Sequence, residues 1–285
     1  QINPPYLIYS LAQAKELNPG SDIFLLGDNI NKYLRFIHHE DFNLYCEGAK
    51  EFEKIYTDKH MSSNDLLFEM FCFQRWFILR DFMRKNQIKK CVHIDSDILL
   101  YANISEEQEK FDHSDFTVSR KGSGHNSFIK LEGIEEFCQF LIDFYTKPSL
   151  FKILESLWEE KKSRPGGICD MTLLNQYYQR NTDKIAQTSD IINDSVYDGN
   201  INASHGFEMH NGIKNIFWVD GKPFCRHLDS GKDIKFNSLH FQGKAKRLMK
   251  DYCTANKTLV SYYMIERKGR RVLSKIKNQF SIVNK

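Results

Sequence analysis

Two aspartates stand at the end of an apolar stretch. In KKCVHIDSDILLY, residues 89–101, a short apolar run leads directly into Asp95 and Asp97, and a second apolar run follows. Two carboxylates held this close repel each other and are costly to bury unless a cation neutralises them. Oxygen ligands of this kind suit Mg²⁺ or Mn²⁺, which keep open positions for substrate phosphates. A turn at the end of a strand is the alternative role for the pair.

A second motif has the residue types that would complete this chemistry. The stretch LHFQGKAK places His240, Gly243 and Lys246 in an H-x-x-G-x-x-K spacing. Histidine supplies a neutral nitrogen ligand, glycine lets the backbone approach a phosphate, and lysine offers a positive charge to a diphosphate. A histidine of the protein core is the alternative for His240 alone. Together the two motifs predict a site for a metal-bound diphosphate.

Alternating helices and strands must position these motifs. Residues 6–17 have helical spacing and end at a stop signal, and residues 23–26 form an apolar run typical of a buried strand. A second helix is expected over 62–87, with Ser62 or Ser63 as its cap. The order indicates an α/β fold with a parallel sheet. In such sheets ligands bind at the carboxyl ends of strands, where the aspartates lie.

The rest of the chain continues the α/β pattern. Residues 115–131 predict two strands joined by a Gly-rich loop, and residues 134–147 and 149–162 predict helices. Residues 164–180 read as a Gly-rich loop that runs into a helix. Short strands and loops are expected over 189–240.

The charge distribution separates a body from a tail. Residues 244–285 contain 12 Lys and Arg against 2 Asp and Glu, whereas the remainder is acidic. We therefore expect a catalytic domain over 1–250 and a basic helical extension over 251–285. A doubly wound sheet starts with a strand, so we expect one to precede residue 1.

The seven cysteines are scattered and show no C-x-x-C spacing, so neither a zinc site nor a disulfide framework is indicated. This favours a reducing, cytoplasmic location. Four N-x-S/T sequons favour a secretory lumen such as the Golgi, more weakly, at Asn103, Asn193, Asn202 and Asn256. No run of 18 apolar residues occurs.

The pair of motifs, HIDSDILLY and LHFQGKAK, resembles the GT-A-fold glycosyltransferases. The resemblance implies the GT-A (Rossmann-like) α/β fold, with a mixed, mostly parallel sheet flanked by helices. The nearest pattern is that of the glycogenin and bacterial galactosyltransferase-like group, glycosyltransferase family 8. The resemblance implies a nucleotide-diphosphate sugar donor, a UDP-sugar in preference, bound through Mn²⁺ or Mg²⁺. It also implies that Asp95, Asp97 and His240 ligate the metal, that Lys246 holds the diphosphate, and that the backbone of Gly243 lies near the phosphates.

Other stretches are similar to the family with less specificity. INPPYL resembles the nucleotide-binding loop after the first strand, which makes Asn3 and Tyr6 candidates for contacts with base or ribose. Arg75 matches a basic residue that contacts the sugar nucleotide in the family. Ser96, between the two aspartates, is grouped with these nucleotide-binding residues.

Two further stretches suggest the sugar pocket. GHNSFIK resembles the segment that borders the donor sugar, which places Asn126 there, although Phe128 replaces the family's glycine. GGICDMTLLN resembles the family's D-Q-D-x-L-N, with Asp170 and Asn175 in register and Thr172 in place of the middle acid. The implied catalytic residues are Asp170 and Asn126.

The expected reaction is transfer of a hexosyl group from the donor to a hydroxyl of a glycan or lipid-linked acceptor. In an inverting enzyme Asp170 would be the general base, and in a retaining one it would position donor or acceptor. The family analogy favours retention. A helix N-cap is the alternative role for Asp170.

Two other functions stay open. A nucleotidyltransferase that makes the sugar nucleotide would need a Gly-rich, basic loop after its first strand, and QINPPYL has neither feature. A non-catalytic glycan-binding domain is the second alternative.

The basic tail suggests a further partner. It predicts an amphipathic helix that contacts an anionic membrane peripherally through Tyr262, Tyr263, Ile265, Val272, Leu273, Ile276 and Phe280. Nucleic-acid binding is not expected, because the body is acidic and lacks the usual motifs.

Overall fold

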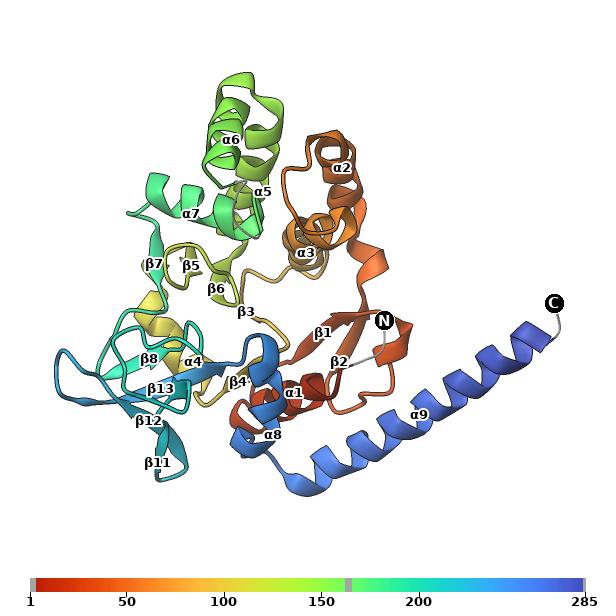
Figure 1. The fold of residues 1–285 in the computed structure, drawn as a ribbon, viewed down its shortest axis with the longest axis vertical. Helices are drawn as coiled ribbons and strands as arrows, with labels where there is room; N and C mark the ends of the chain where they lie inside the picture. Colours follow the sequence, from red (N-terminus) through yellow and green to blue (C-terminus); the bar gives the residue numbers. More distant parts are fainter. Residues whose placement is uncertain (1–3, 162–165, 284–285) are drawn as a thin grey trace. The chain divides into compact units, whose positions relative to one another are not determined.

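The computed structural model describes residues 4–161 and 166–283, and the side chains of residues 4–160 and 166–273. The chain divides into two compact units (Figure 1). Unit 1 consists of Gln1–Glu40, Asp95–Glu106 and Ile191–Lys285, and unit 2 consists of Asp41–Ile94 and Glu107–Asp190. The expected boundary at residue 250 stays a prediction, and the chain beyond it clusters with unit 1.

Unit 1 is built around the long strand β13 (Asp233–His240). The strands β12 (Lys222–Arg226) and β4 (Ile98–Leu100) pair with it antiparallel, and β8 (Ser195–Tyr197) pairs with it in parallel. A fifth strand, β11 (Phe217–Val219), continues the sheet beyond β12. Smaller ladders join β1 (Phe24–Gly27) to β2 (His38–Asp41) and β9 (Met209–His210) to β10 (Ile213–Lys214).

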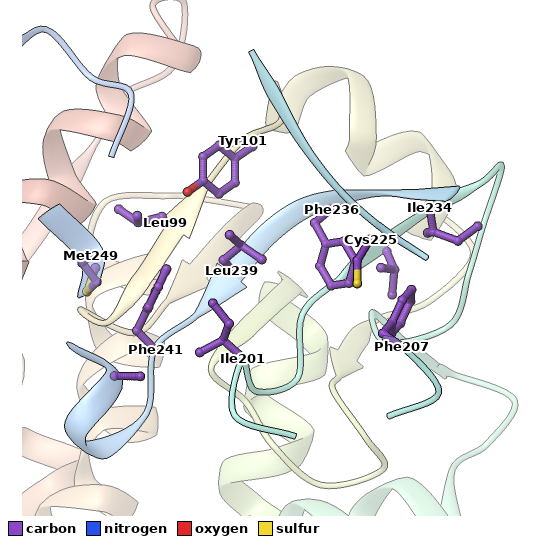
Figure 2. Close-up of a cluster of buried hydrophobic side chains, with 12 residues drawn as sticks. Leu99, Tyr101, Ile201, Phe207, Cys225, Ile234, Phe236, Leu239, Phe241 and Met249 are labelled. Atoms are coloured by element: carbon purple, nitrogen blue, oxygen red, sulfur yellow. The ribbon is translucent and has the colours of Figure 1, made fainter. Parts of the chain in front are cut away.

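Figure 2 shows the buried core around β13. Alternate β13 side chains, Ile234 and Phe236, point into it, as expected for a strand of period two. Burying one such side chain stabilises the fold by about 1.5–3 kcal/mol. The core therefore fixes β13, whose last residue is His240. The other labelled members are Leu99, Tyr101, Ile201, Phe207, Cys225, Leu239, Phe241 and Met249.

Helices at both ends of the chain also belong to unit 1. The predicted N-terminal helix is confirmed as α1 (Pro5–Leu17), which starts with proline in its first turn. The basic tail is confirmed as helical in α8 (Met249–Tyr252) and α9 (Lys257–Val283). Tyr263 of α9 is buried in a cluster with α1 side chains and Tyr33, so one face of α9 is fixed to the unit.

Unit 2 combines a four-stranded sheet with helices. The sheet order is β3 (Lys90–Ile94), β6 (Asn126–Lys130), β5 (Phe116–Val118) and β7 (Ile185–Gln187). The helices of this unit are α2 (Glu47–Tyr56), α3 (Leu66–Lys85), α5 (Leu131–Thr146), α6 (Pro148–Lys161) and α7 (Asp170–Arg180), whereas the short α4 (Ile104–Glu107) lies mostly in unit 1. Its helices meet around closely packed rings of Phe52, Tyr56, Phe73, Phe77 and Tyr145.

The cap of α3 differs from the expected one. The Asp65 carboxylate accepts the N–H groups of Leu67 and Phe68, so Asp65 is the N-cap. Ser62 and Ser63 instead contact the carbonyl of Gly166. The helix starts at Leu66, so Asp65 directly precedes its first turn and the two serines lie too early in the chain to cap it.

The mixed α/β class is confirmed, but parallel pairing does not dominate. The parallel pairs are β5 with β7 and β13 with β8. The pairs β3 with β6, β5 with β6, β11 with β12, β12 with β13 and β13 with β4 are antiparallel. The physical reason is that β5 and β6, like β12 and β13, are joined by short loops, which antiparallel strands allow and parallel strands do not.

Candidate functional site

Strand pairing brings the two chemical motifs of unit 1 together. In the β13–β4 ladder His240 stands opposite Ile98, the residue after Asp97. The Phe241 N–H then donates to the carbonyl of Asp97 at 3.0 Å. The D-x-D stretch and the H-x-x-G-x-x-K stretch are therefore joined by main-chain hydrogen bonds, which fixes both side chains at one end of β13.

Asp97 and His240 form a buried pair at this end. The His240 Nδ1 atom lies 2.9 Å from the Gly199 carbonyl, which only accepts, so Nδ1 holds a proton. Nε2 then faces Asp97 Oδ1 at 3.5 Å. Burial alone would lower the pKa of His240, but the hydrogen bond and the charge of Asp97 raise it overall. Burial would likewise raise the pKa of Asp97, yet His240 and Lys246 hold it below its usual value.

Lys246 completes this cluster from the 3₁₀ turn Gly243–Leu248. Its Nζ lies 3.1 Å from Asp97 Oδ2 and 5.1 Å from the centre of the Tyr6 ring. Burial would lower the pKa of Lys246, but Asp97 raises it. Tyr6, predicted to contact the nucleotide, thus stands beside the cation predicted to hold the diphosphate.

Gly243 has a backbone shape that favours glycine. Its φ is +56°, and a Cβ added there would meet no heavy atom within 4 Å among the atoms described. The requirement is therefore conformational, because an L side chain is strained in this region of φ. The main chain of the turn is left uncovered by a side chain at this point.

The carboxylate of Asp97 and the imidazole of His240 are ligand types that suit a divalent cation, but the three predicted ligands are not grouped together. Asp97 and His240 are adjacent. The His240 Nδ1–H donates to the Gly199 carbonyl, and metal-binding histidines usually donate their other ring N–H in this way. Asp95 forms a turn, since its carbonyl accepts the Ile98 N–H, and Ser96 in that turn is exposed. Across residues 4–161 and 166–283, no three His, Cys, Asp or Glu side chains are grouped as a metal site. The metal role of Asp95 and the nucleotide role of Ser96 stay predictions.

Unit 2 holds three further predicted residues, Arg75, Asn126 and Asp170. Asp170 is the first residue of α7 and is 3% exposed, so it is not the N-cap, which is Cys169. Its Oδ2 accepts from the Arg75 guanidinium at 2.6 Å and from the Trp76 indole at 3.1 Å. The structure therefore pairs two predicted residues, Arg75 and Asp170. Trp76 was not predicted as part of the site. The sequence signal that could have indicated it is its position directly after Arg75 in α3.

Asn126 begins β6 and is 1% exposed. Neither its amide oxygen nor its amide nitrogen has a hydrogen-bond partner in the described part of the chain. A buried amide of this kind usually has a partner. Its predicted role near the donor sugar remains a prediction, and Asn3 lies outside the described residues.

None of the helices formed by residues 4–161 and 166–283 is both long and apolar enough to cross a bilayer.

Comparisons with known proteins give likenesses to solved structures alone. No family model matches the chain, and no curated protein sequence matches it. Among solved structures, the chain is similar to mouse xyloside xylosyltransferase 1 in its apo form, with a TM-score of 0.48 and 10% sequence identity. The likeness covers 68% of this chain and 83% of the mouse chain.

Proposed function

We propose that the protein is a metal-dependent GT-A glycosyltransferase, similar to family 8. It moves a sugar from a nucleotide-diphosphate donor, a UDP-sugar in preference, to a hydroxyl of a glycan or glycolipid. The observation that carries this proposal is the sharing of one buried carboxylate, Asp97, between His240 and Lys246. A carboxylate, an imidazole and an ammonium together are the groups that a metal-bound diphosphate requires.

In this proposal Asp95, Asp97 and His240 would hold Mn²⁺ or Mg²⁺. The bound cation would supply positive charge to the diphosphate as it leaves the sugar. Lys246 would turn from Asp97 to the leaving phosphate, since Asp97 would then have a different counter-charge. The open backbone at Gly243 would let that phosphate approach the turn, and Tyr6 would face the nucleoside.

In the same proposal, Asp170 and Arg75 would lie at the sugar that is transferred. Arg75 neutralises the buried Asp170 carboxylate, and Trp76 fixes one of its oxygens. A carboxylate held in this way suits positioning of donor or acceptor hydroxyls, which agrees with a retaining reaction. In an inverting reaction Asp170 would instead accept the acceptor proton. Asn126, with Asp170, would border the transferred sugar.

The deciding experiment is thermal unfolding with UDP, with Mn²⁺ and with both. We expect a rise in Tm that needs both ligands, because a ligand at about 100 times its Kd stabilises a protein by about 2.7 kcal/mol. Asp97→Asn should abolish the joint effect. Asp251→Asn is the matched control, since this carboxylate lies in the same unit but is largely exposed.

The outcomes separate the other candidates. A glycan-binding domain would respond to neither UDP nor Mn²⁺. A nucleotidyltransferase would consume UTP and a sugar 1-phosphate with release of pyrophosphate, whereas the proposed enzyme would release UDP from a UDP-sugar. Nucleotide release across a set of donors, with Mn²⁺ present, would then identify the sugar.

The acceptor proposal includes peripheral membrane contact in the cytoplasm. On α9, Tyr262, Ile265 and Val272 are exposed and recur at spacings that share one helix face, while Tyr263 packs on the unit. Lys268 and Arg271 are exposed close by. This combination fits anionic lipid, where lipid-linked acceptors reside. Sedimentation with phosphatidylserine vesicles should retain the full chain and lose Ile265→Asp; equal binding of both would contradict the contact.

A further inference from the structure

Lys214 is a lysine of the protein interior, 1% exposed. Its Nζ lies 2.9 Å from Asp198 Oδ1, 2.6 Å from the Asn200 carbonyl and 2.5 Å from the Ala203 carbonyl. An ammonium has three N–H donors, and each of the three meets an oxygen here. Burying such a charge is costly, so the three contacts define a specific anchoring point for the loop 198–203.

The anchored loop holds the end of β13. Asp198 Oδ2 accepts the His240 N–H at 3.1 Å, and the Ile201 N–H donates to the His240 carbonyl at 2.9 Å. Ile201 lies in the core beside β13 in Figure 2. The Gly199 carbonyl accepts the His240 Nδ1 proton. The loop that Lys214 anchors therefore holds both the main chain and the side chain of His240 in place.

The same loop continues to the residue that precedes Gly243. The Asn202 amide donates to the Gln242 carbonyl at 3.2 Å, and the Asn200 amide donates to the Gln242 side chain at 2.7 Å. The loop therefore backs the H-x-x-G-x-x-K stretch from its histidine to its glycine.

We propose that Lys214 and Asp198 are positioning residues for His240. They hold the loop so that Gly199 keeps the proton of His240 on Nδ1 and Nε2 is presented as the metal-binding atom. This role rests on the proposed function, because it assigns His240 a metal. It differs from simple support of the fold, because a loosened loop would change which ring nitrogen holds the proton and how tightly a cation binds.

The test uses the double variant Lys214→Met/Asp198→Asn in the full chain. It removes both buried charges with little change in volume, whereas Lys214→Met alone leaves a buried carboxylate without its counter-charge and endangers folding. Ile234→Ala is the matched control, since it destabilises the same core at the end of β13 that is opposite to His240. Mn²⁺ affinity is measured by electron paramagnetic resonance of the free ion.

We expect the double variant to bind Mn²⁺ about 10- to 100-fold more weakly, and the control to bind like the wild type. Long-range ¹⁵N spectra of the metal-free proteins at alkaline pH, where the ring is neutral, give an independent readout. His240 should be the Nδ1–H tautomer in the wild type and a mixture in the double variant.

Each other outcome overturns a defined statement. Equal Mn²⁺ affinity of wild type and double variant, or an unchanged tautomer in the variant, overturns the positioning role and leaves the proposed metal site standing. A wild type that binds no Mn²⁺ overturns the metal site of the proposed function, and the positioning role with it.

Discussion

The Lys246 ammonium lies 3.1 Å from Asp97 Oδ2, while the other oxygen of Asp97 faces His240. Asp97 is buried, and Lys246 is half-buried on the turn that follows β13. One carboxylate therefore organises a nitrogen ligand and a cation around a single point. The candidate metal ligand His240 and the candidate phosphate ligand Lys246 contact different oxygens of Asp97. Metal binding and phosphate binding should therefore be separable by mutation.

Lys246→Met should weaken UDP binding in the presence of Mn²⁺ while leaving Mn²⁺ binding in place. A hydrogen bond to a charged group contributes about 1.5–3 kcal/mol, which is roughly 10- to 100-fold in Kd. Calorimetric titration with UDP checks this value. Lys244→Met is the control, because Lys244 is exposed on the same turn. Equal losses in both variants would point to general charge rather than to a specific contact.

The Arg75–Asp170 pair should be strongly coupled in stability. The two side chains are 24% and 5% exposed and 2.6 Å apart, so Arg75→Met leaves a carboxylate buried without its counter-charge. We expect a loss of roughly 3 kcal/mol in unfolding free energy for Arg75→Met, and a smaller loss for Arg75→Met/Asp170→Asn. Urea unfolding of the four proteins of the cycle measures the coupling.

The exposed pair Lys232–Asp194 provides the control cycle. Its side chains are 63% and 64% exposed, and such pairs contribute about 0–1 kcal/mol. A coupling in the Arg75–Asp170 cycle no larger than this would show that the buried pair has no special role in the fold.

Gly124→Ala should disturb Asp170 from a distance. A Cβ at Gly124 would lie 2.4 Å from the Trp76 ring and 3.2 Å from Leu174, and Trp76 donates to Asp170. Overpacking of this kind costs about 1–3 kcal/mol, and we expect donor turnover to fall with it. Gly20→Ala is matched, because its Cβ would meet no described atom within 4 Å. Unfolding midpoints and nucleotide release check both effects.

The local chemistry was readable in the sequence because it depends on residue type and spacing. Asp97, His240 and Lys246 were predicted together, and the β13–β4 register shows how main-chain pairing joins them. Lys214 was not predicted, since a single lysine in a stretch of mixed polar and apolar residues gives no sign that it will be buried. The direction of strand pairing could not be predicted from the apolar pattern either, because apolar runs look alike in parallel and antiparallel pairs.

The stability of the metal-free protein should depend on pH through His240. Asp97 raises the pKa of His240 against the effect of burial, so the ring keeps its proton above the usual value of about 6.5. A raised pKa stabilises the metal-free fold fully below the unfolded value, and this stabilisation is lost as the pH rises through the folded value. The lowered pKa of Asp97 acts at acidic pH, because its contribution to stability is lost as the pH falls through the folded pKa of this carboxyl. The metal-free wild type should therefore lose stability relative to His240→Gln as the pH rises above about 6.5.

Mn²⁺ should reverse this trend, since a metal ligand must lose its proton before it binds. Mn²⁺ affinity should rise with pH until the folded pKa of His240 is passed and then level off, and binding below that point should release a proton. Calorimetry in two buffers of different ionisation enthalpy counts that proton, and His240→Gln should release none from this site. Two results would contradict the prediction. An equal dependence of unfolding free energy on pH in both proteins would show that His240 is not the partner of Asp97, and an Mn²⁺ affinity that does not change with pH would show that it is not a ligand.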